Sequence, residues 1–408
     1  MRKTRWKRIG LIALIIALVT MLIVGVSMVS AIAKHTSEKS ESSPHSGTSS
    51  DQKVNNELFD SQLFNATHNR SRWLYDLINA SGRAKIDNES DGNAIFRTAY
   101  RLGLIDTVSE DDLFRPLDRL FIAQTTVRAL GYPERTVGDL ADVPPAQKSV
   151  MGTMAYYGYF VPDHEDMVYP NAAISAKEYE RLKTELNRYR ALKGKKVLAF
   201  GDSIMHGNGN HEEGIAVLIA TKYGMTVNDY SVPGASFGDR GERSRICNQI
   251  RVAQMADEKA DLILLNGGTN DMGHTPFGEN DKGFDMTDAD ETTFTGGMQK
   301  ALWMLRMNWK GIPVVYTRVH NMDLVEDKLE RQYGDWALDI TDKWEIPSVD
   351  LYNGTTMNTE NKAICDRYTF VDERYGEDHD SIHPNALGYA KYYLPPIAKA
   401  VAEQFNEV

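Results

Sequence analysis

Four short segments in the second half of the chain carry groups that nucleophilic acyl transfer requires. Ser203, within Gly-Asp-Ser-Ile-Met-His-Gly, offers a hydroxyl. Asp380 lies three residues before His383, so its carboxylate can accept one imidazole N–H while the other ring nitrogen acts as a general base. Gly234 lets the backbone approach a ligand, and the Asn270 amide is a donor that can reach an oxyanion. Each segment alone is equally typical of a turn or a helix cap.

The elements around these segments explain why they could meet. Beyond residue 194, short apolar runs alternate with helical patterns, which is typical of a parallel sheet covered on both faces. The expected strands are Lys196–Phe200, Thr226–Tyr230, Leu262–Asn266, Val314–Arg318 and Ser348–Leu351. The expected helices are Glu213–Tyr223, Glu242–Asp257, Phe294–Trp309, Leu324–Trp344 and Pro384–Phe405. The first three segments follow the first three strands, at the sheet edge where ligands bind, and the fourth precedes the last helix.

In this order the four segments resemble the blocks of the SGNH, or GDSL, hydrolases. The resemblance covers the chain from about Lys195 to its end and implies an α/β fold with a flavodoxin-like doubly wound parallel sheet. It implies that Ser203 is the nucleophile, His383 the base and Asp380 its orienting acid. It also implies an oxyanion hole from the N–H groups of Ser203 and Gly234 and the Asn270 amide. The implied reaction is ester hydrolysis through an acyl-enzyme, with no metal and no cofactor.

Three further residues are candidates for the substrate pocket because they lie near expected strand ends. They are Asp202, His206 and His274. For the two histidines, solvated loop positions are the alternative. His379 adjoins Asp378 and Asp380, a grouping that could hold a metal ion, but no paired histidine spacing on a helix accompanies it. We therefore expect no metal site.

A helical module at residues 57–192 is expected to precede the α/β half at residues 193–408. Apolar residues recur with helical spacing at Asn93–Leu102 and Ile122–Leu130. Pro116 and Pro170, 54 residues apart, each precede by four residues an aliphatic residue that opens a helix, which is a weak internal repeat. The pattern resembles S-layer homology repeats, which implies docking on a cell-wall polymer, although the arginine usual in that family is absent from both copies. The alternative is a structural helical spacer.

The N-terminal segment predicts a membrane anchor. Five cations within the first eight residues are followed by Ile9–Ala33, an uncharged apolar run long enough to cross a bilayer. We expect residues 1–34 to be a cytoplasmic basic tip with a transmembrane signal anchor, and residues 35–56 to be a Ser-rich flexible linker. The positive-inside rule places the remainder outside, in a single-pass protein of the cell membrane. The alternative is a secreted protein cleaved after Ala33, since Ala31-Ile32-Ala33 fits a signal-peptidase site.

Charge and composition exclude several classes of protein. The chain has 408 residues, 42% hydrophobic and 25% charged, which excludes a wholly disordered or multi-spanning protein. From Lys34 onward, 41 basic residues face 57 acidic ones with no basic run, so we expect no nucleic-acid partner. Cys247 and Cys365 are too few for a disulfide framework or a zinc site. We expect two buried free thiols, with a single disulfide as the alternative.

The expected substrate follows from the combination of parts. An ester hydrolase outside the membrane, beside a wall-binding module, would meet acylated cell-surface polysaccharide, so we expect removal of O-acetyl groups from a glycan. An O-acetyltransferase that receives acetyl from a membrane partner would use the same residues. A wall-binding scaffold whose hydrolase half is silent is a third hypothesis, from a different class.

Overall fold

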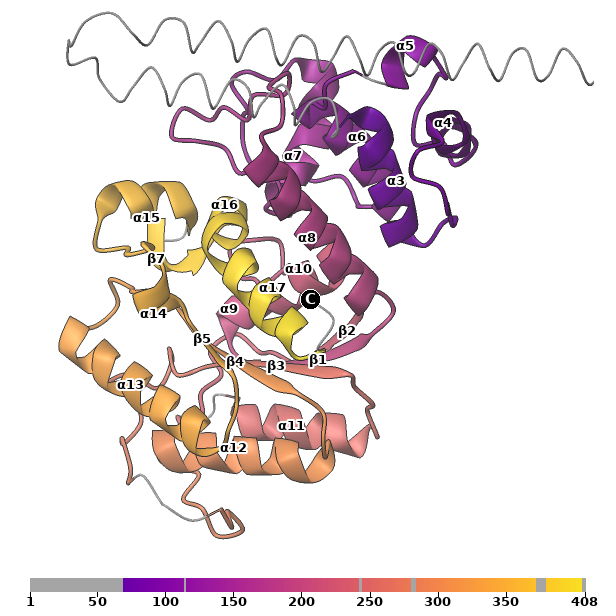
Figure 1. Ribbon diagram of the computed structural model, residues 1–408. Helices are drawn as coiled ribbons and strands as arrows, with labels where there is room; N and C mark the ends of the chain where they lie inside the picture. Colours follow the sequence, from indigo (N-terminus) through magenta and orange to yellow (C-terminus); the bar gives the residue numbers. More distant parts are fainter. Residues whose placement is uncertain (1–68, 114, 242–243, 280–283, 372–378, 406–408) are drawn as a thin grey trace, which may run out of the picture. The chain divides into compact units, whose positions relative to one another are not determined.

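A parallel five-stranded sheet forms the centre of the α/β half. The computed structural model describes residues 69–405 apart from 114, 242–243, 280–283 and 372–378. Within this part of the chain, the parallel strands follow the order β2-β1-β3-β4-β5 (Figure 1). They are β1 (Lys196–Phe200), β2 (Thr226–Asp229), β3 (Leu262–Asn266), β4 (Val314–Arg318) and β5 (Ser348–Asp350). This is the order of a flavodoxin-like sheet, so the predicted parallel α/β fold is confirmed.

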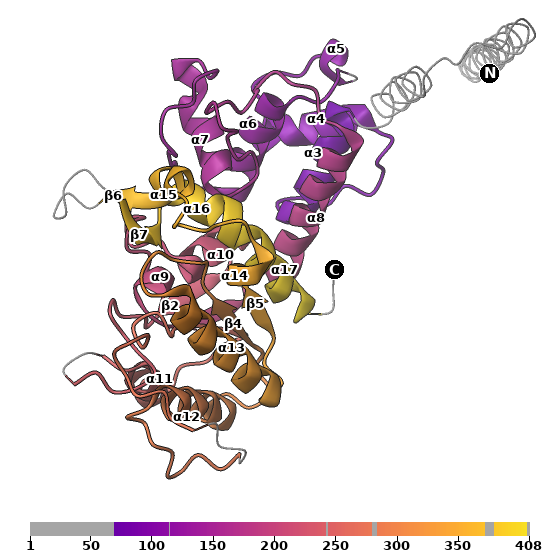
Figure 2. The same cartoon turned by 90° about the vertical axis from the view of Figure 1, so that its left-hand side faces the viewer.

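Helices cover the sheet on both faces, which is why the central strands β1, β3 and β4 can be apolar on both sides. α10 (Ile215–Tyr223) and α17 (Leu394–Glu403) pack on one face. α11 (Ile246–Met255), α12 (Phe294–Asn308) and α13 (Asp327–Lys343) form the layer on the other face (Figures 1 and 2). The four helices predicted between residues 213 and 344 are therefore confirmed as α10 to α13.

The prediction of one continuous final helix from Pro384 is wrong. Pro384 is the last residue of β7 (His379–Pro384), which pairs antiparallel with β6 (Thr369–Val371) in a separate two-stranded sheet. β6 follows α15 (Lys362–Tyr368), which in turn follows α14 (Leu351–Gly354). The segment that carries His383 is thus a short strand rather than the first turn of a helix.

The helical part that follows β7 is interrupted. The Asn385 side chain accepts a hydrogen bond from Gly388 N, 3.0 Å away, and so caps α16 (Ala386–Gly388). A π-helical segment at Tyr389–Tyr393 follows, and α17 continues to Glu403. α17 has a proline pair in its first turn, where the missing backbone N–H groups are tolerated. A helix that ran uniformly through these prolines would lose hydrogen bonds, which explains the interruption.

The helical module is a set of short helices around a common apolar core. They are α3 (Arg70–Ser81), α4 (Gly92–Arg101), α5 (Glu110–Leu113), α6 (Arg119–Leu130), α7 (Lys148–Tyr156), α8 (Ala176–Leu192) and a 3₁₀ turn at Pro145–Gln147. Trp73 is buried in this core, and its indole Nε1 donates to Thr125 Oγ1 at 3.0 Å. The predicted helices at Asn93–Leu102 and Ile122–Leu130 are confirmed as α4 and α6.

The two proline-containing segments of the module pair with each other. Leu120 N donates to Pro170 O at 2.8 Å, and Ile174 N donates to Leu117 O at 3.0 Å. A similar bridge joins Asn69, immediately before α3, to the first proline segment. The helices α3, α6 and α8 therefore start from one small network of bridges. The proline pattern in the sequence indicated only the beginnings of α6 and α8, because no proline marks the beginning of α3 at Asn69.

A buried ion pair joins the helical module to the α/β half. The module and the α/β half belong to one compact unit that spans Asp60–Val408. Lys222 of α10 is 2% exposed and lies 2.8 Å from the Glu185 carboxylate of α8. Tyr223 donates its hydroxyl to the same carboxylate at 2.6 Å, and Arg188 binds the other oxygen at 2.5 Å. Burial acts to raise the pKa of Glu185, but the adjoining cations and hydroxyl prevail and lower it to about 2.

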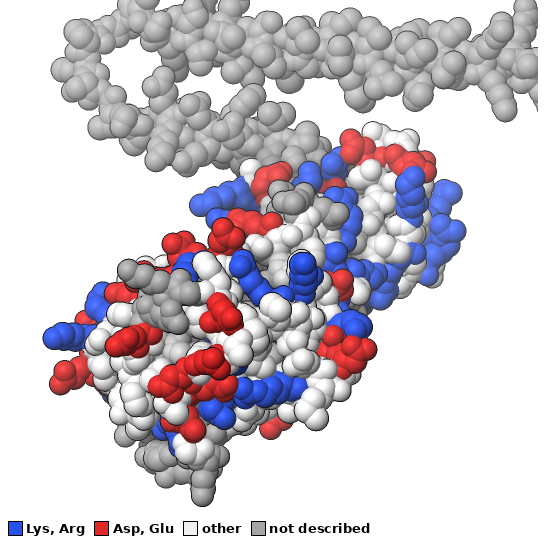
Figure 3. Space-filling model, turned by 90° about the horizontal axis from the view of Figure 1, so that it is seen from below, with Lys and Arg blue, Asp and Glu red and all other residues white. Residues whose placement is uncertain are grey.

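The predictions for the two cysteines and for the N-terminal anchor have different outcomes. Cys247 and Cys365 are both free and buried, as predicted. The anchor predicted at residues 1–34 and the linker at residues 35–56 lie outside the described residues. Within the described ranges, none of the helices has the length and apolar character needed to cross a bilayer. On the face drawn in Figure 3, acidic and basic side chains are interspersed.

We predict that Glu185→Ala lowers the free energy of unfolding by about 3–5 kcal/mol, because it leaves the Lys222 ammonium buried without a carboxylate. Urea unfolding followed by circular dichroism measures the change. The matched control is Glu180→Ala, an exposed glutamate of the same helix, whose effect should stay within about 0.5 kcal/mol. Equal effects of the two substitutions would contradict the stabilising role of the pair.

Candidate active site

Ser203 lies at the first residue of α9 (Ser203–His206), directly beyond the carboxyl end of β1. Asp202 caps this short helix, since its Oδ1 accepts a hydrogen bond from Ile204 N at 2.9 Å. The Tyr389 hydroxyl donates to Ile204 O at 2.7 Å and holds the same turn from the C-terminal segment. Among the described residues, the Ser203 N–H has no hydrogen-bond partner, so it can donate to an anion.

Two buried amides that the sequence analysis missed hold the turn before Ser203. Gln249 of α11 accepts from Gly201 N at 2.9 Å and donates to Gly201 O at 2.8 Å. Asn266, the last residue of β3, donates to Asp202 Oδ1 at 3.0 Å. A Cβ added at Gly201 would lie 2.0 Å from Asn266 Oδ1, so this position requires glycine. The sequence signal for Gln249 was an uncharged polar residue on an otherwise apolar helix face. The signal for Asn266 was an uncharged polar residue at the end of an apolar strand.

β7 brings His383 to Ser203. The His383 Nε2 lies 2.8 Å from Ser203 Oγ, and the His383 Nδ1 is hydrogen-bonded to Asp380 Oδ2. Asp380 Oδ1 accepts from the backbone N–H groups of His383, at 2.9 Å, and of Ile382, at 3.1 Å. Because the carboxylate accepts the Nδ1–H, the Nε2 is left to accept a proton from the serine hydroxyl. The three side chains therefore form one chain of hydrogen bonds.

The part of β7 that carries Asp380 has a strained backbone and is anchored by hydrogen bonds. Ser381 has a φ of 59°, in the left-handed region that is uncommon for residues other than glycine. Its hydroxyl donates to Asp323 O at 3.0 Å, and its carbonyl accepts from Thr359 Oγ1 at 2.8 Å. A conformation of this kind costs about 1–3 kcal/mol and persists when the surrounding structure fixes it. Here the two anchors fix the distance between Asp380 and His383.

Gly234 and Asn270 lie in the loops beyond β2 and β3. The Asn270 Nδ2 donates to Ala235 O at 3.0 Å, and since a side-chain amide has two N–H donors, one remains for a ligand. Among the described residues, the Gly234 N–H has no hydrogen-bond partner. Val232 N donates to Gly201 O at 3.1 Å and joins this loop to the turn before Ser203. The structure thus brings the first three segments to one edge of the sheet.

Asp271 is a further buried group that the sequence analysis did not select. Its Oδ2 accepts from Phe237 N at 2.9 Å, and its Oδ1 accepts from Gly238 N at 2.8 Å and from Thr275 Oγ1 at 3.0 Å. Burial raises the pKa of Asp271 to about 6, although these hydrogen bonds act to lower it. The carboxyl ties together the two loops that carry the predicted oxyanion donors.

The three pocket candidates have different surroundings. Asp202 is fully buried, and burial raises its pKa; its carboxylate caps the turn that carries Ser203. His206 is half-buried at the end of α9 and close enough to Asp229 to interact electrostatically. His274 is exposed, and its backbone N–H donates to Asp271 O at 2.9 Å. Within the described part of the chain, neither histidine is hydrogen-bonded to Ser203, His383 or Asp380.

The remaining histidines near the site have structural partners. His320 is fully buried, which lowers its pKa to about 3 and keeps it neutral, and its Nδ1 lies 2.6 Å from the Tyr393 hydroxyl. His379 Nδ1 lies 2.9 Å from Thr369 O, while its neighbour Asp378 is outside the described residues. No three His, Cys, Asp or Glu side chains gather as a metal site in the ranges that the structure describes.

Residues 199–391 match the model of the GDSL-like lipase/acylhydrolase family. No curated protein matches the chain. The matched range includes all four segments that the sequence analysis selected, together with the strands β3 to β5 and the two-stranded sheet of His383.

Solved structures similar to the chain include three bacterial proteins. A protein from Lactobacillus plantarum is 20% identical, with 52% of this chain and 95% of that chain covered and a TM-score of 0.39. A putative GDSL-like lipase from Bacteroides uniformis is 19% identical, with 53% and 97% covered and a TM-score of 0.36. Est24, a carbohydrate acetylesterase from Sinorhizobium meliloti, is 15% identical, with 51% and 99% covered and a TM-score of 0.35. From the family match, the α/β half of this chain is a GDSL-like lipase/acylhydrolase domain of the SGNH superfamily, which makes the protein an ester hydrolase.

Proposed function

We propose that the chain hydrolyses esters with Ser203 as nucleophile, His383 as general base and Asp380 as the acid that orients the imidazole. The observation that carries the proposal is the continuous set of hydrogen bonds from Ser203 Oγ through His383 to Asp380. Ser203 Oγ attacks the ester carbonyl while His383 Nε2 takes its proton, and the imidazolium returns that proton to the departing alcohol. Water, activated by His383, then attacks the acyl-serine and releases the acid.

The oxyanion of each tetrahedral intermediate is held in this proposal by three donors. They are the backbone N–H groups of Ser203 and Gly234 and the second N–H of the Asn270 amide. The lack of protein partners for the two backbone groups, among the described residues, supports this assignment. Fixed donors of this kind stabilise the developing charge without reorganisation during the reaction.

The substrate that we propose is an O-acetylated polysaccharide at the outer surface of the cell. The proposal rests on the apolar segment at Ile9–Ala33, which would anchor the chain with the hydrolase outside, and on the helical module that precedes the hydrolase domain. Cleavage after Ala33 would instead give a secreted enzyme with the same substrate. An acetyltransferase that passes the acyl group to a glycan hydroxyl instead of water is the second candidate, because the same residues would perform it.

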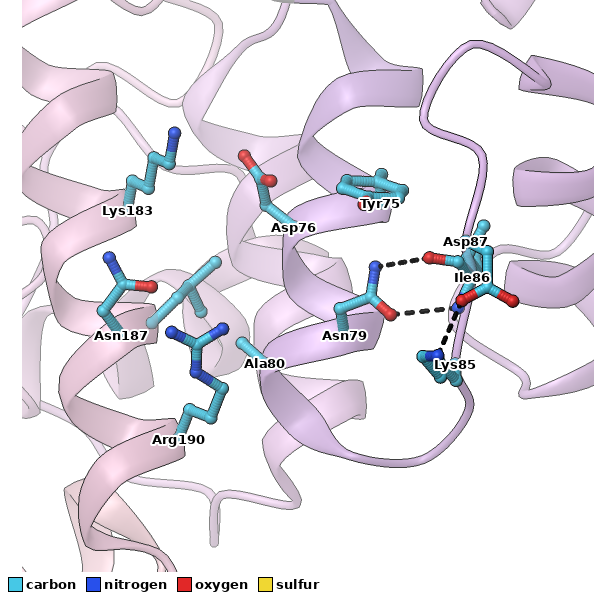
Figure 4. A pocket seen from close by; sticks show the side chains of 11 residues that line it. Tyr75, Asp76, Asn79, Ala80, Lys85, Ile86, Asp87, Lys183, Asn187 and Arg190 are labelled. Carbon is cyan, nitrogen blue, oxygen red and sulfur yellow. Dashed lines mark hydrogen bonds and ion pairs between the residues drawn. The ribbon is translucent and has the colours of Figure 1, made fainter. Parts of the chain in front are cut away.

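We propose in addition that the helical module binds a cell-wall polymer, and a polar pocket in the module supports this. It lies between α3 and α8, has a volume of about 470 Å³ and shares no residue with the candidate active site (Figure 4). Lys183, Asn187 and Arg190 line it from α8, and Asp76 faces them from α3. Within the described residues, neither Lys183 nor Arg190 forms an ion pair, so both cations can bind acidic or hydroxyl groups of a glycan.

We predict that Ser203→Ala hydrolyses p-nitrophenyl acetate no faster than buffer, because no other group replaces the attacking oxygen. Release of p-nitrophenol by the purified full-length chain, with the wild type as reference, measures this. Turnover by the variant at the wild-type rate would refute the assignment. Product analysis with an acetyl donor and an oligosaccharide then separates the two candidate reactions: acetylated sugar in excess over free acetate would favour the transferase.

We predict that Asn270→Ala lowers kcat by about 10²–10³-fold, equivalent to about 2.7–4 kcal/mol in the barrier, because one oxyanion donor is lost. The variant should still be labelled at Ser203 by a fluorophosphonate, though more slowly. Asn308→Ala, an exposed asparagine at the end of α12, is the control and should keep most of the activity. An Asn270→Ala variant with wild-type kcat would remove this residue from the oxyanion hole.

We predict that the double change Lys183→Ala and Arg190→Ala reduces retention of the chain on purified cell walls, because the two unpaired cations of the pocket are lost. Sedimentation of wall fragments measures retention, which should also fall with added salt. Hydrolysis of p-nitrophenyl acetate should be unchanged. Arg97→Ala with Arg101→Ala on α4 is the charge-matched control, and an equal loss in that variant would refute the pocket as the wall contact.

A further inference from the structure

The loop between α9 and α10, residues 207–214, lies against both Ser203 and His383. On one side, Ser203 O accepts from Gly207 N at 2.9 Å and from Asn208 N at 3.0 Å. On the other side, a Cβ added at Gly209 would lie 3.2 Å from the Cβ of His383 and 2.6 Å from that of Phe370. Gly209 also has a φ of 84°, which favours glycine. A shift of this loop would therefore change the relation between the hydroxyl and the imidazole.

The 207–214 loop has a backbone that needs outside support. His211 and Glu212 have φ values of 54° and 62°, in the left-handed region that residues other than glycine seldom adopt. Conformations of this kind persist where contacts with the surrounding structure determine them. The next residue, Glu213, makes those contacts.

The support comes from the helical module. Arg135, which follows α6, holds the Glu213 carboxylate with two nitrogen atoms: its Nε lies 3.0 Å from Oε2, and its Nη2 contacts Oε1. Tyr156, the last residue of α7, donates its hydroxyl to Glu213 Oε2 at 2.7 Å. The buried Asn210 side chain donates to Tyr156 Oη at 3.0 Å and to Glu213 O at 2.8 Å. Module and loop thus share one hydrogen-bonded network.

The electrostatics of this network keep it formed at neutral pH. Burial acts to raise the pKa of Glu213, but the hydrogen bonds from Arg135 and Tyr156 outweigh burial and lower it. The carboxylate is therefore charged wherever an ordinary glutamate is charged. A planar guanidinium matches a carboxylate with two parallel donors, a geometry that lysine does not reproduce.

The module also reaches the segment that carries His383. Arg367 of α15 lies 2.7 Å from the Asp166 carboxylate of the module and also binds Asp163 O. The Arg367 carbonyl accepts from Asn385 Nδ2 at 3.0 Å, two residues after His383. Both parts of the Ser203–His383 pair are therefore tied to the module, one through Glu213 and the other through Arg367.

We propose that Arg135 and Tyr156 of the helical module are positioning residues for ester hydrolysis, because they fix through Glu213 the loop that sets Ser203 against His383. This inference rests on the function proposed above. It gives the module a role in the reaction itself, independent of any binding of a wall polymer. Within the described residues, the hydrogen bonds of the two side chains go to Glu213, Asn210 and Glu134 and not to Ser203, His383 or Asp380, so the expected effect is on kcat rather than on KM.

Arg135→Ala in the full-length chain should lower kcat for p-nitrophenyl acetate by about 10- to 100-fold with KM unchanged, because small misplacements of reacting groups have effects of this size. Tyr156→Phe should give a smaller loss, and Arg135→Lys should recover part of the activity lost in Arg135→Ala. The rate of fluorophosphonate labelling at Ser203 should fall in parallel, since it depends on the same activated hydroxyl.

The matched control is Arg128→Ala. Arg128 also donates two hydrogen bonds, each of 3.1 Å, to the carboxylate of Asp106, but this ion pair lies wholly within the module. It should keep the wild-type kcat. A folded Arg135→Ala with wild-type kcat would overturn the proposal, as would an equal loss in Arg128→Ala or a change confined to KM. If Arg135→Ala does not fold, Tyr156→Phe, which removes a single hydroxyl, decides in the same way.

The proposed function and this inference fail in distinguishable ways. If Ser203→Ala is as active as the wild type, the assigned nucleophile is wrong. If activity depends on Ser203 but the Arg135 and Tyr156 variants retain wild-type kcat, the nucleophile stands and the module has no positioning role.

Discussion

The hydrogen bond between Ser203 Oγ and His383 Nε2 is the interaction on which the site depends, and it joins residues 180 positions apart in the chain. A contact of that separation has no local support, so both ends must be held by their own surroundings. At one end Ser203 starts a four-residue helix that Asp202 caps and that follows β1, whose last four residues are buried. At the other end His383 lies in the two-stranded antiparallel sheet of β6 and β7, and β7 is anchored through Ser381.

Buried polar groups provide most of this support. Gln249, Asn266 and Asp271 are each almost fully buried, and each is hydrogen-bonded to a backbone or side chain of a loop at the edge of the sheet. Burial of such groups is unfavourable unless their hydrogen bonds are satisfied, so a change in any loop would leave a donor or an acceptor without a partner. The loops are consequently fixed to each other as well as to the strands that precede them.

The helical module belongs to the same system of constraints. Besides a shared apolar core, its contacts with the α/β half include two specific ion pairs: Glu185 with Lys222 of α10, and Arg135 with Glu213 of the loop before α10. A spacer would need neither, since a flexible linker can carry a domain without touching it. The contacts at Glu213, in the 207–214 loop, and at Arg367, in α15, reach the two segments on which the geometry of Ser203 and His383 depends. In this protein the module and the hydrolase domain therefore form one structural unit.

The sequence by itself determined the parallel sheet, its five strands and the three segments that follow the first three strands, because apolar runs and their spacing are local properties of the chain. The residue types of Ser203, Asn270, Asp380 and His383 also indicated their chemistry, since few other groups supply a nucleophile, a base and amide donors in that order. Periodicity could not show that Pro384 ends a strand, because β7 exists only through its pairing with β6. Periodicity also could not show the burial of Asp202, the hydrogen bonds of Gln249 to Gly201 or the ion pair of Arg135 with Glu213. Only the tertiary structure decided these features, because each depends on which distant segment of the chain packs against the residue. The type of a single polar side chain does not indicate its partner.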